Sequence, residues 1–146
     1  MNNSIPTSLL EIHETQKPGF QPLIDSDCWR VAILSFAPDL TPQQLVEFQR
    51  HNESDEVFVL LSGRCILFLG EGDDSVTWVF AHNLEPFKLY NVRRRAWHAH
   101  VQSADAKLLI VENRNTSRLN SPRIDLSPHQ REEIFELTRQ LWGVHG

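Results

Sequence analysis

Short runs of apolar or alternating residues recur through the middle of this 146-residue chain, and Pro, Gly, Asn and Asp separate them. Runs of this kind predict β-strands, because alternate side chains of a strand face the same core. We expect strands at residues 29–36, 45–51, 56–62, 64–70, 75–82, 86–92, 97–102 and 106–113. Eight short strands in succession are typical of a jelly roll or a closed barrel, so the sequence predicts an all-β fold.

The segments between these strands support the same prediction. The Ser-Gly pair at 62–63 and the run GEGDD at 70–74 are typical of tight hairpin turns. The stretch 36–45, which contains two prolines, predicts a loop or a single helical turn. Since 40% of the residues are hydrophobic, we expect a single domain over 1–146, with the core barrel at about 28–113.

The C-terminal part of the chain departs from the strand pattern. Ser127 is a typical N-cap residue, and Pro128 suits the first position of a helix. The apolar residues that follow recur at helical spacing: Ile134, Leu137, Leu141 and Trp142. The sequence therefore predicts an α-helix over 127–142 that packs on the outside of the barrel through this stripe.

Composition and charge argue against several classes of protein. The formal net charge is −5 and the chain has no basic stripe, whereas nucleic-acid binding relies on clustered Lys and Arg. No run of about 20 apolar residues occurs, so we expect no membrane segment, and the first residues show no signal-peptide pattern. Cys28 and Cys65 fit no metal or disulfide spacing and are interpreted as reduced thiols. We therefore expect a cytoplasmic protein.

Polar side chains gather on what we expect to be the inner faces of two strands. Because side chains alternate along a strand, Gln49 and His51 share one face, and so do His98 and His100. Trp97 needs burial on the opposite face, which turns the two histidines toward the concave side of the barrel. A buried polar group without a partner costs about 1–3 kcal/mol, so these side chains need partners or a ligand.

Two stretches resemble the sequence motifs of the cupin superfamily. The first motif of the family is G-x5-H-x-H-x(3,4)-E-x6-G, and the stretch RHNESDEVFVLLSG, residues 50–63, is similar to its second half. His51 matches the second His of the motif, Glu56 follows after four residues, and Gly63 follows after six more. RRRAWHAHVQ, residues 93–102, is similar to the second motif, P-x-G-x-x-H-x3-N, with His98 and Gln102 in the His and Asn places. The resemblance covers about residues 45–113 and implies a double-stranded β-helix barrel.

Four positions depart from these motifs. Gln43 and Gln49 stand where the first motif has Gly and His, and Arg93 and Arg95 stand where the second has Pro and Gly. Cupins with complete motifs bind a divalent metal through three His and one Glu. The resemblance here leaves a set of two His and one carboxylate, with Gln49 in the fourth place: His51, Glu56 and His98. Such a set suits Zn(II), Mn(II), Fe(II) or Ni(II), and a polar pocket without metal is the alternative.

Each of these residues also has a purely structural interpretation. His51 fits a strand-end histidine bonded to backbone, Glu56 a solvated charge, and His98 with His100 an exposed polar stripe. The pocket interpretation is favoured because Glu56 and Gly63 are in register with the motif. The other acidic residues of the run NESDE are interpreted as solvated loop charges.

The remaining candidates concern ligand binding. Phe58 alternates with Glu56 and is expected to line the same interior, so Gln49, Phe58 and His100 are the predicted binding residues. The run Arg93 to Arg95 has two interpretations, capture of an anionic substrate and solvated arginines on an acidic surface, and the second is favoured.

Two functions fit these features. The first is a module that binds a small polar or anionic molecule, with or without metal. The second is a metal-dependent enzyme, of the isomerase or dioxygenase type, that acts on a sugar or a carboxylic acid. The departures from the motifs favour the module, and the retained histidines favour the enzyme. The segment 8–14, SLLEIHE, suits the covering of a sheet edge, and cupins commonly dimerise in this way, so we expect a homodimer.

Overall fold

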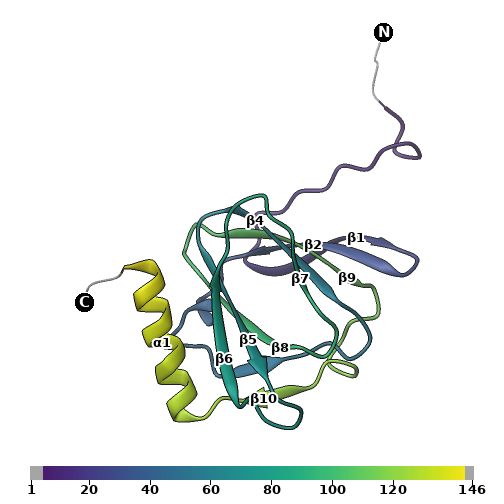
Figure 1. Cartoon of the computed structure of the whole chain (residues 1–146). Coiled ribbons are helices and arrows are strands. Elements are labelled where there is room, and N and C mark those ends of the chain that lie inside the picture. Colours follow the sequence, from purple (N-terminus) through teal and green to yellow (C-terminus); the bar gives the residue numbers. More distant parts are fainter. Residues whose placement is uncertain (1–4, 144–146) are drawn as a thin grey trace.

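The computed structural model describes residues 5–143, which form two antiparallel sheets with one helix against them (Figure 1). The first sheet has the strand order β1 (Gly19–Ser26), β2 (Trp29–Ser35), β9 (Lys107–Asn113), β4 (Glu56–Ser62) and β7 (Tyr90–Val92). The second sheet has the order β10 (Arg123–Asp125), β3 (Glu47–Gln49), β8 (Trp97–Gln102), β5 (Cys65–Glu71) and β6 (Trp78–Asn83). A 3-10 turn, η1 (Pro38–Leu40), follows β2, and α1 (Pro128–Trp142) ends the described chain.

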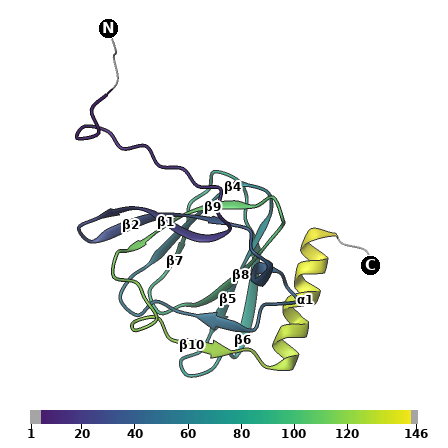
Figure 2. The same ribbon diagram turned by 180° about the vertical axis from the view of Figure 1, so that it is seen from behind.

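Strands that are distant in sequence lie side by side in both sheets. β9 pairs with both β2 and β4, and β8 pairs with both β3 and β5. The two sheets face each other and enclose an interior, and α1 lies outside the second sheet, as the view from behind also shows (Figure 2). This arrangement is a double-stranded β-helix, so the predicted all-β barrel with a C-terminal helix is confirmed.

Two strands were not indicated by the sequence pattern. β1 contains Pro22, and its register with β2 is broken between Pro22 and Ile24. An edge strand tolerates both features, because one side of its backbone makes no ladder hydrogen bonds. β10 has only three residues, which is too short for an alternating pattern to be recognised.

Three strands are shorter than the sequence predicted. The segment 86–92 becomes a strand only at Tyr90, since Pro86 lacks an N–H and Phe87 has a φ of 64°. The predicted strands at 45–51 and 75–82 are reduced to β3 and β6. The stretch after β2 forms the single turn η1, as predicted.

The hairpin between β4 and β5 depends on Gly63. This residue has a φ of 69°, in the region that favours glycine. A β-carbon at this position would lie 2.5 Å from the Cα of Ala106. The backbone of another strand end therefore leaves no space for a side chain, and the motif glycine is required by close approach as well as by backbone conformation.

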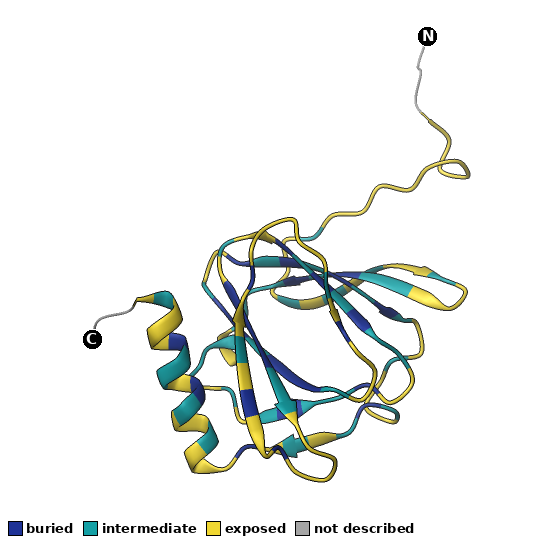
Figure 3. Cartoon of the chain, in the orientation of Figure 1, coloured by how far each residue is buried: buried dark blue, intermediate teal, exposed yellow. Residues whose placement is uncertain are grey.

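The apolar core has two layers, one inside the barrel and one between the second sheet and α1 (Figure 3). β8 lies between the two layers, and its side chains alternate between them. Trp97, Ala99 and Val101 face the helix layer, whereas the histidines between them face the barrel interior. The predicted direction of the histidine face is confirmed.

The helix begins with a capping box. The Ser127 side chain accepts a hydrogen bond from the Gln130 N–H, and the Gln130 side chain accepts one from the Ser127 N–H. Ile134 is fully buried against the second sheet. The predicted stripe is wrong at Leu141, which is 43% exposed, because Thr138 rather than Leu141 faces the sheet and is 4% exposed.

The chain before β1 runs away from the barrel (Figure 1). Leu9 and Ile12, in the segment predicted to cover a sheet edge, are 77% and 85% exposed. In the single chain this segment pairs with no strand among the described residues, so its role in a dimer stays a prediction. Within residues 5–143 no helix has the length and apolar character needed to cross a membrane.

Candidate metal centre

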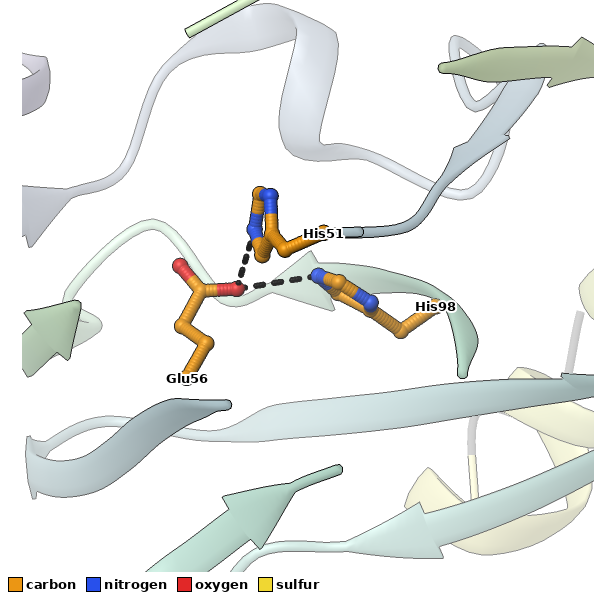
Figure 4. Close-up of side chains that lie close together, drawn as sticks. All are labelled: His51, Glu56 and His98. Atoms are coloured by element: carbon orange, nitrogen blue, oxygen red, sulfur yellow. Dashed lines mark hydrogen bonds and ion pairs between the residues drawn. The ribbon is translucent and has the colours of Figure 1, made fainter. Parts of the chain in front are cut away.

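Three buried side chains converge near the ends of three strands: His51, Glu56 and His98. His51 follows β3, Glu56 opens β4, and His98 is the second residue of β8. The Nε2 atoms of His51 and His98 each lie 2.9 Å from the same carboxylate oxygen, Oε2 of Glu56 (Figure 4). All three predicted metal ligands therefore meet, with their donor atoms within 4.8 Å of one another.

Backbone contacts around the site explain this convergence. Gln49 and His98 are paired in the ladder between β3 and β8, which places His51 beside His98. The carbonyl of His51 accepts a 2.8 Å hydrogen bond from the N–H of Arg95, so the turn before β8 is tied to the end of β3. The short turn of residues 52–55 then returns the chain to Glu56.

Arg95 occupies the place of the glycine in the second cupin motif, and its backbone lies in the left-handed region that favours glycine. Its φ is 71°, which is unfavourable for a side chain with a β-carbon. A glycine at this position would therefore adopt the same backbone conformation with less strain.

The protonation of His98 is fixed by its neighbour. Its Nδ1 lies 3.0 Å from the carbonyl oxygen of Ala96, which can only accept, so Nδ1 carries the proton. When the ring is neutral, Nε2 then presents a lone pair to the carboxylate of Glu56. Two acceptors at this distance repel each other unless a cation, either a proton or a metal ion, lies with them.

The pKa values of the site reflect this coupling. Burial would raise the pKa of Glu56, but its close contacts with His51 and His98 and the positive charge of these rings when protonated outweigh burial and lower the pKa to about 2. Burial would lower the pKa of His51, but the hydrogen bond and charge of Glu56 raise it above 6.5. The carboxylate is thus held ionised and attracts a cation.

A cavity of about 490 Å³ opens beside the three residues and is lined by parts of both sheets and of the loops around 40–46 and 116–121. Gln49 lines it and accepts a 3.3 Å hydrogen bond from Arg123. His100 also lines it, with both ring nitrogens buried and without partners among the described residues, and burial lowers its pKa to about 4. Phe58, predicted to line the same interior, is not among the residues that line the cavity; it is 1% exposed and packs edge-on against His98.

The run Arg93 to Arg95 lies outside this cavity and is exposed. Asp55, interpreted from sequence as a solvated charge, pairs with Arg93 at 3.3 Å and accepts a 2.7 Å hydrogen bond from the N–H of Arg94. The pKa of Asp55 is lowered by its hydrogen bonds, first that from Asn91 and then that from Arg94. The arginines therefore fasten the turn before β8 to the turn between His51 and Glu56.

Sequence reasoning missed a carboxylate in the cavity wall. Glu112 is 7% exposed and faces Arg30 across the ladder between β9 and β2, with Oε1 3.5 Å from Nη1 of Arg30. Burial, and then the charge of Glu56, raise the pKa of Glu112 to about 7. The alternation of Leu108, Ile110 and Glu112 placed this side chain on the inner face and was the available signal.

A second missed residue, Ser121, contacts His51 directly. Its hydroxyl oxygen lies 2.7 Å from Nδ1 of His51, and the residue is 5% exposed. It belongs to the loop between β9 and β10, which is outside the segment that resembles the cupin motifs. No local pattern in the sequence marks it.

No protein-family model and no curated protein matches the sequence. Among solved structures, a variant of PAC13 from Streptomyces in complex with uridine is 12% identical, with 82% of this chain and 87% of that chain covered and a TM-score of 0.54. A protein from Bacillus halodurans is 16% identical over 68% of this chain and 73% of its own, with a TM-score of 0.52. A cupin-2 domain protein from Shewanella frigidimarina is 17% identical over 74% and 88%, with a TM-score of 0.47. At these identities the likeness is one of fold.

Proposed function

We propose that this chain, whose fold is the double-stranded β-helix of the cupins, binds one divalent transition metal ion through His51, Glu56 and His98. The ion would lie in a pocket for a small polar or anionic molecule. The observation that carries the proposal is the convergence of a lone pair of His98 and a carboxylate held ionised, an arrangement that requires a cation.

The donor set fits such an ion. Two imidazoles and one carboxylate suit Zn(II), Mn(II), Fe(II) or Ni(II) and leave coordination positions for water or a ligand. A bound ion of this kind polarises a coordinated oxygen and lowers the pKa of bound water. Gln49, at the place of the missing third histidine, lines the same cavity and offers a weaker oxygen donor.

One arginine of the cavity wall, rather than the balance of its charges, supports an anionic ligand, because four carboxylates also line the wall: Asp39, Glu47, Glu56 and Glu112. Three arginines line it: Arg30, Arg118 and Arg123. Arg123 pairs with Glu47, and Arg30 pairs with Asp25 at 3.1 Å, whereas Arg118 has no ion pair with any residue in the described part of the chain. The guanidinium group of Arg118 is therefore the candidate to bind a carboxylate of the ligand.

The metal proposal is tested by elemental analysis of native protein and by calorimetric titration of the metal-free protein with each of the four ions. We expect one saturable site per chain, which His51→Ala and His98→Ala abolish. His129→Ala, which removes an exposed histidine at the start of α1, is the control and should bind as wild type does. Absence of a saturable site, or equal binding by the His98 variant, would falsify the proposal and leave a hydrogen-bonded polar pocket.

The ligand class is tested on the metal-loaded protein with glycolate and its neutral amide, glycolamide. We expect glycolate to bind more tightly, and Arg118→Gln to remove most of the difference. Equal binding of both compounds, or an unchanged difference in the variant, would contradict an anionic ligand.

A metal-dependent enzyme is the second candidate, and Glu112 favours it. A buried carboxyl whose pKa lies near 7 suits proton transfer to or from a molecule in the cavity. Sugars and carboxylic acids that exchange carbon-bound hydrogen with D2O in the presence of metal-loaded protein, followed by NMR, would identify this activity. Glu112→Gln should abolish the exchange, and exchange that persists in the variant would assign it elsewhere.

A homodimer in the cytoplasm completes the proposal. The exposed apolar side chains of the segment before β1, among them Leu9 and Ile12, support association with a second copy, because the described chain offers them no cover. Free thiols at Cys28 and Cys65 agree with a reducing compartment.

A further inference from the structure

The tautomer of His51 is not fixed by its nearest neighbour alone. Nδ1 of His51 lies 2.7 Å from the hydroxyl oxygen of Ser121. A hydroxyl both donates and accepts, so two arrangements fit this distance. If Ser121 donates to Nδ1, then Nε2 carries the proton and points it at Glu56. If Ser121 accepts from Nδ1, then Nε2 keeps its lone pair for a cation.

The direction of the Ser121 hydroxyl depends on Asn120. The Oδ1 atom of Asn120 lies 3.2 Å from the Ser121 hydroxyl and can only accept. A rotation of the Asn120 amide by half a turn would exchange Oδ1 and Nδ2 and would lose a second hydrogen bond, because Oδ1 also accepts one of 2.9 Å from the N–H of Ser117. The hydroxyl proton is therefore directed at Asn120, and the Ser121 oxygen is left to accept.

The orientation of Asn120 depends in turn on Glu53. The Nδ2 atom of Asn120 donates to Oε2 of Glu53 at 3.2 Å and to the carbonyl of Asn115 at 3.0 Å. Because a carboxylate only accepts hydrogen bonds, Glu53 requires that the Nδ2 atom of Asn120, and not its Oδ1 atom, faces it. The same oxygen of Glu53 accepts a 2.9 Å hydrogen bond from the side chain of Asn115.

We propose that Glu53, Asn120 and Ser121 form a relay of fixed hydrogen-bond directions that holds His51 as its Nδ1–H tautomer and keeps Nε2 free for a metal ion. The role of this relay in metal binding rests on the proposed metal function. The three residues are positioning residues, because they act through His51. Glu53 lies in the turn between two proposed metal ligands, and Asn120 and Ser121 lie in the loop after β9, so the relay joins two parts of the chain that are distant in sequence.

Two substitutions separate the relay from a general effect on folding. Ser121→Ala removes the acceptor for Nδ1–H, and the proton is then expected on Nε2, where Glu56 accepts it. Ser121→Thr restores a hydroxyl at the same atom. The control is Ser62→Ala, which also removes one hydroxyl hydrogen bond, that from Ser62 to the carbonyl of Asp105 at 3.0 Å, but far from the cavity.

The first readout is the dissociation constant for Zn(II), measured by competition with a chelating dye. Loss of a hydrogen-bond partner of a metal-binding histidine typically weakens metal binding by about 10–100-fold, and we expect this range for Ser121→Ala. Ser121→Thr and Ser62→Ala should remain within about threefold of wild type. Wild-type affinity in Ser121→Ala, or a threonine variant as weak as the alanine variant, overturns the proposal.

The second readout needs no metal. Long-range 1H–15N correlation spectra of the metal-free protein, recorded at a pH high enough that the His51 signals no longer shift, distinguish the two neutral tautomers of His51. Glu56 lies 2.9 Å from Nε2 and favours Nε2–H in both proteins, so we expect a larger Nδ1–H population in wild type than in Ser121→Ala. Equal Nδ1–H populations in the two proteins overturn the relay even if the metal binds. Failure of Zn(II) to bind wild type, with the larger Nδ1–H population observed, instead overturns the proposed function and leaves the relay supported.

Discussion

Replacement of Glu112 by glutamine is expected to stabilise the metal-free protein at alkaline pH and to have little effect in acid. Glu112 is buried in the cavity wall, and its one ion pair, with Arg30, is long at 3.5 Å. An ionised carboxylate at this position is therefore poorly compensated, whereas glutamine is neutral at every pH.

The magnitude follows from the pKa of Glu112, which burial and the charge of Glu56 raise from 4.5 to about 7. Between these values the folded protein retains a proton that the unfolded chain has released, so stability falls as the pH rises. The loss is absent below pH 4.5 and complete above about pH 7. At about 1.4 kcal/mol per pH unit, the stability that wild type loses reaches about 3 kcal/mol. Glutamine removes this loss but also weakens the contact with Arg30, so we expect Glu112→Gln to be more stable than wild type by about 1–3 kcal/mol.

The assay is urea unfolding of wild type and Glu112→Gln in the presence of a chelator, at a series of pH values from 4.5 to about 8.5. The difference in unfolding free energy should grow with pH across this interval. Glu132→Gln, which replaces an exposed glutamate of α1, is the matched control and should follow wild type throughout. A difference that is constant with pH, or largest in acid, would refute the reasoning.

Three further results are expected. Arg95→Gly should raise the unfolding free energy by about 0.5–1 kcal/mol, because relief of the positive φ exceeds the entropy that glycine adds to the unfolded chain; a lower urea midpoint would contradict this. Zn(II) affinity should fall about tenfold or more between pH 8 and pH 6, since protons compete for His51, whose pKa is raised; equal affinities would exclude this histidine as a ligand. Light scattering at micromolar concentration should give a dimer mass, and deletion of residues 8–14 a monomer; a monomeric full-length chain would rule out the arm-mediated dimer.

Most of the fold was predictable because its strands carry local patterns. The run at 56–62 alternates between buried and half-buried residues before its exposed end, and nearly all residues of the run at 97–102 are buried. The turn at residue 63 requires glycine because its φ is positive. β1 and β10 were not predictable, because they are strands only through their partners. Pro22 is unfavourable within a central strand, and the edge position that tolerates it depends on long-range pairing with β2.

The site was predictable only as far as the motif spacing reached. His51, Glu56 and His98 were found from the intervals between them, which the turn of residues 52–55 and the ladder of β3 with β8 convert into contact. Ser121 could not be found in this way, because its position beside His51 is set by a loop between other strands. The run Arg93 to Arg95 was conspicuous in sequence but lies outside the cavity.

The pairing of β2 with β9 has a consequence for how the protein is made. β2 is synthesised early, yet its partner strand lies near the other end of the barrel sequence, so the first sheet cannot close until β9 has left the ribosome. Contacts between such distant segments slow folding, since a long loop must be ordered before they form. Ser121 emerges later still. An ion that needs His51, Glu56 and His98 together would thus be acquired after translation of nearly the whole chain, and cellular metal availability at that moment would decide which ion is captured.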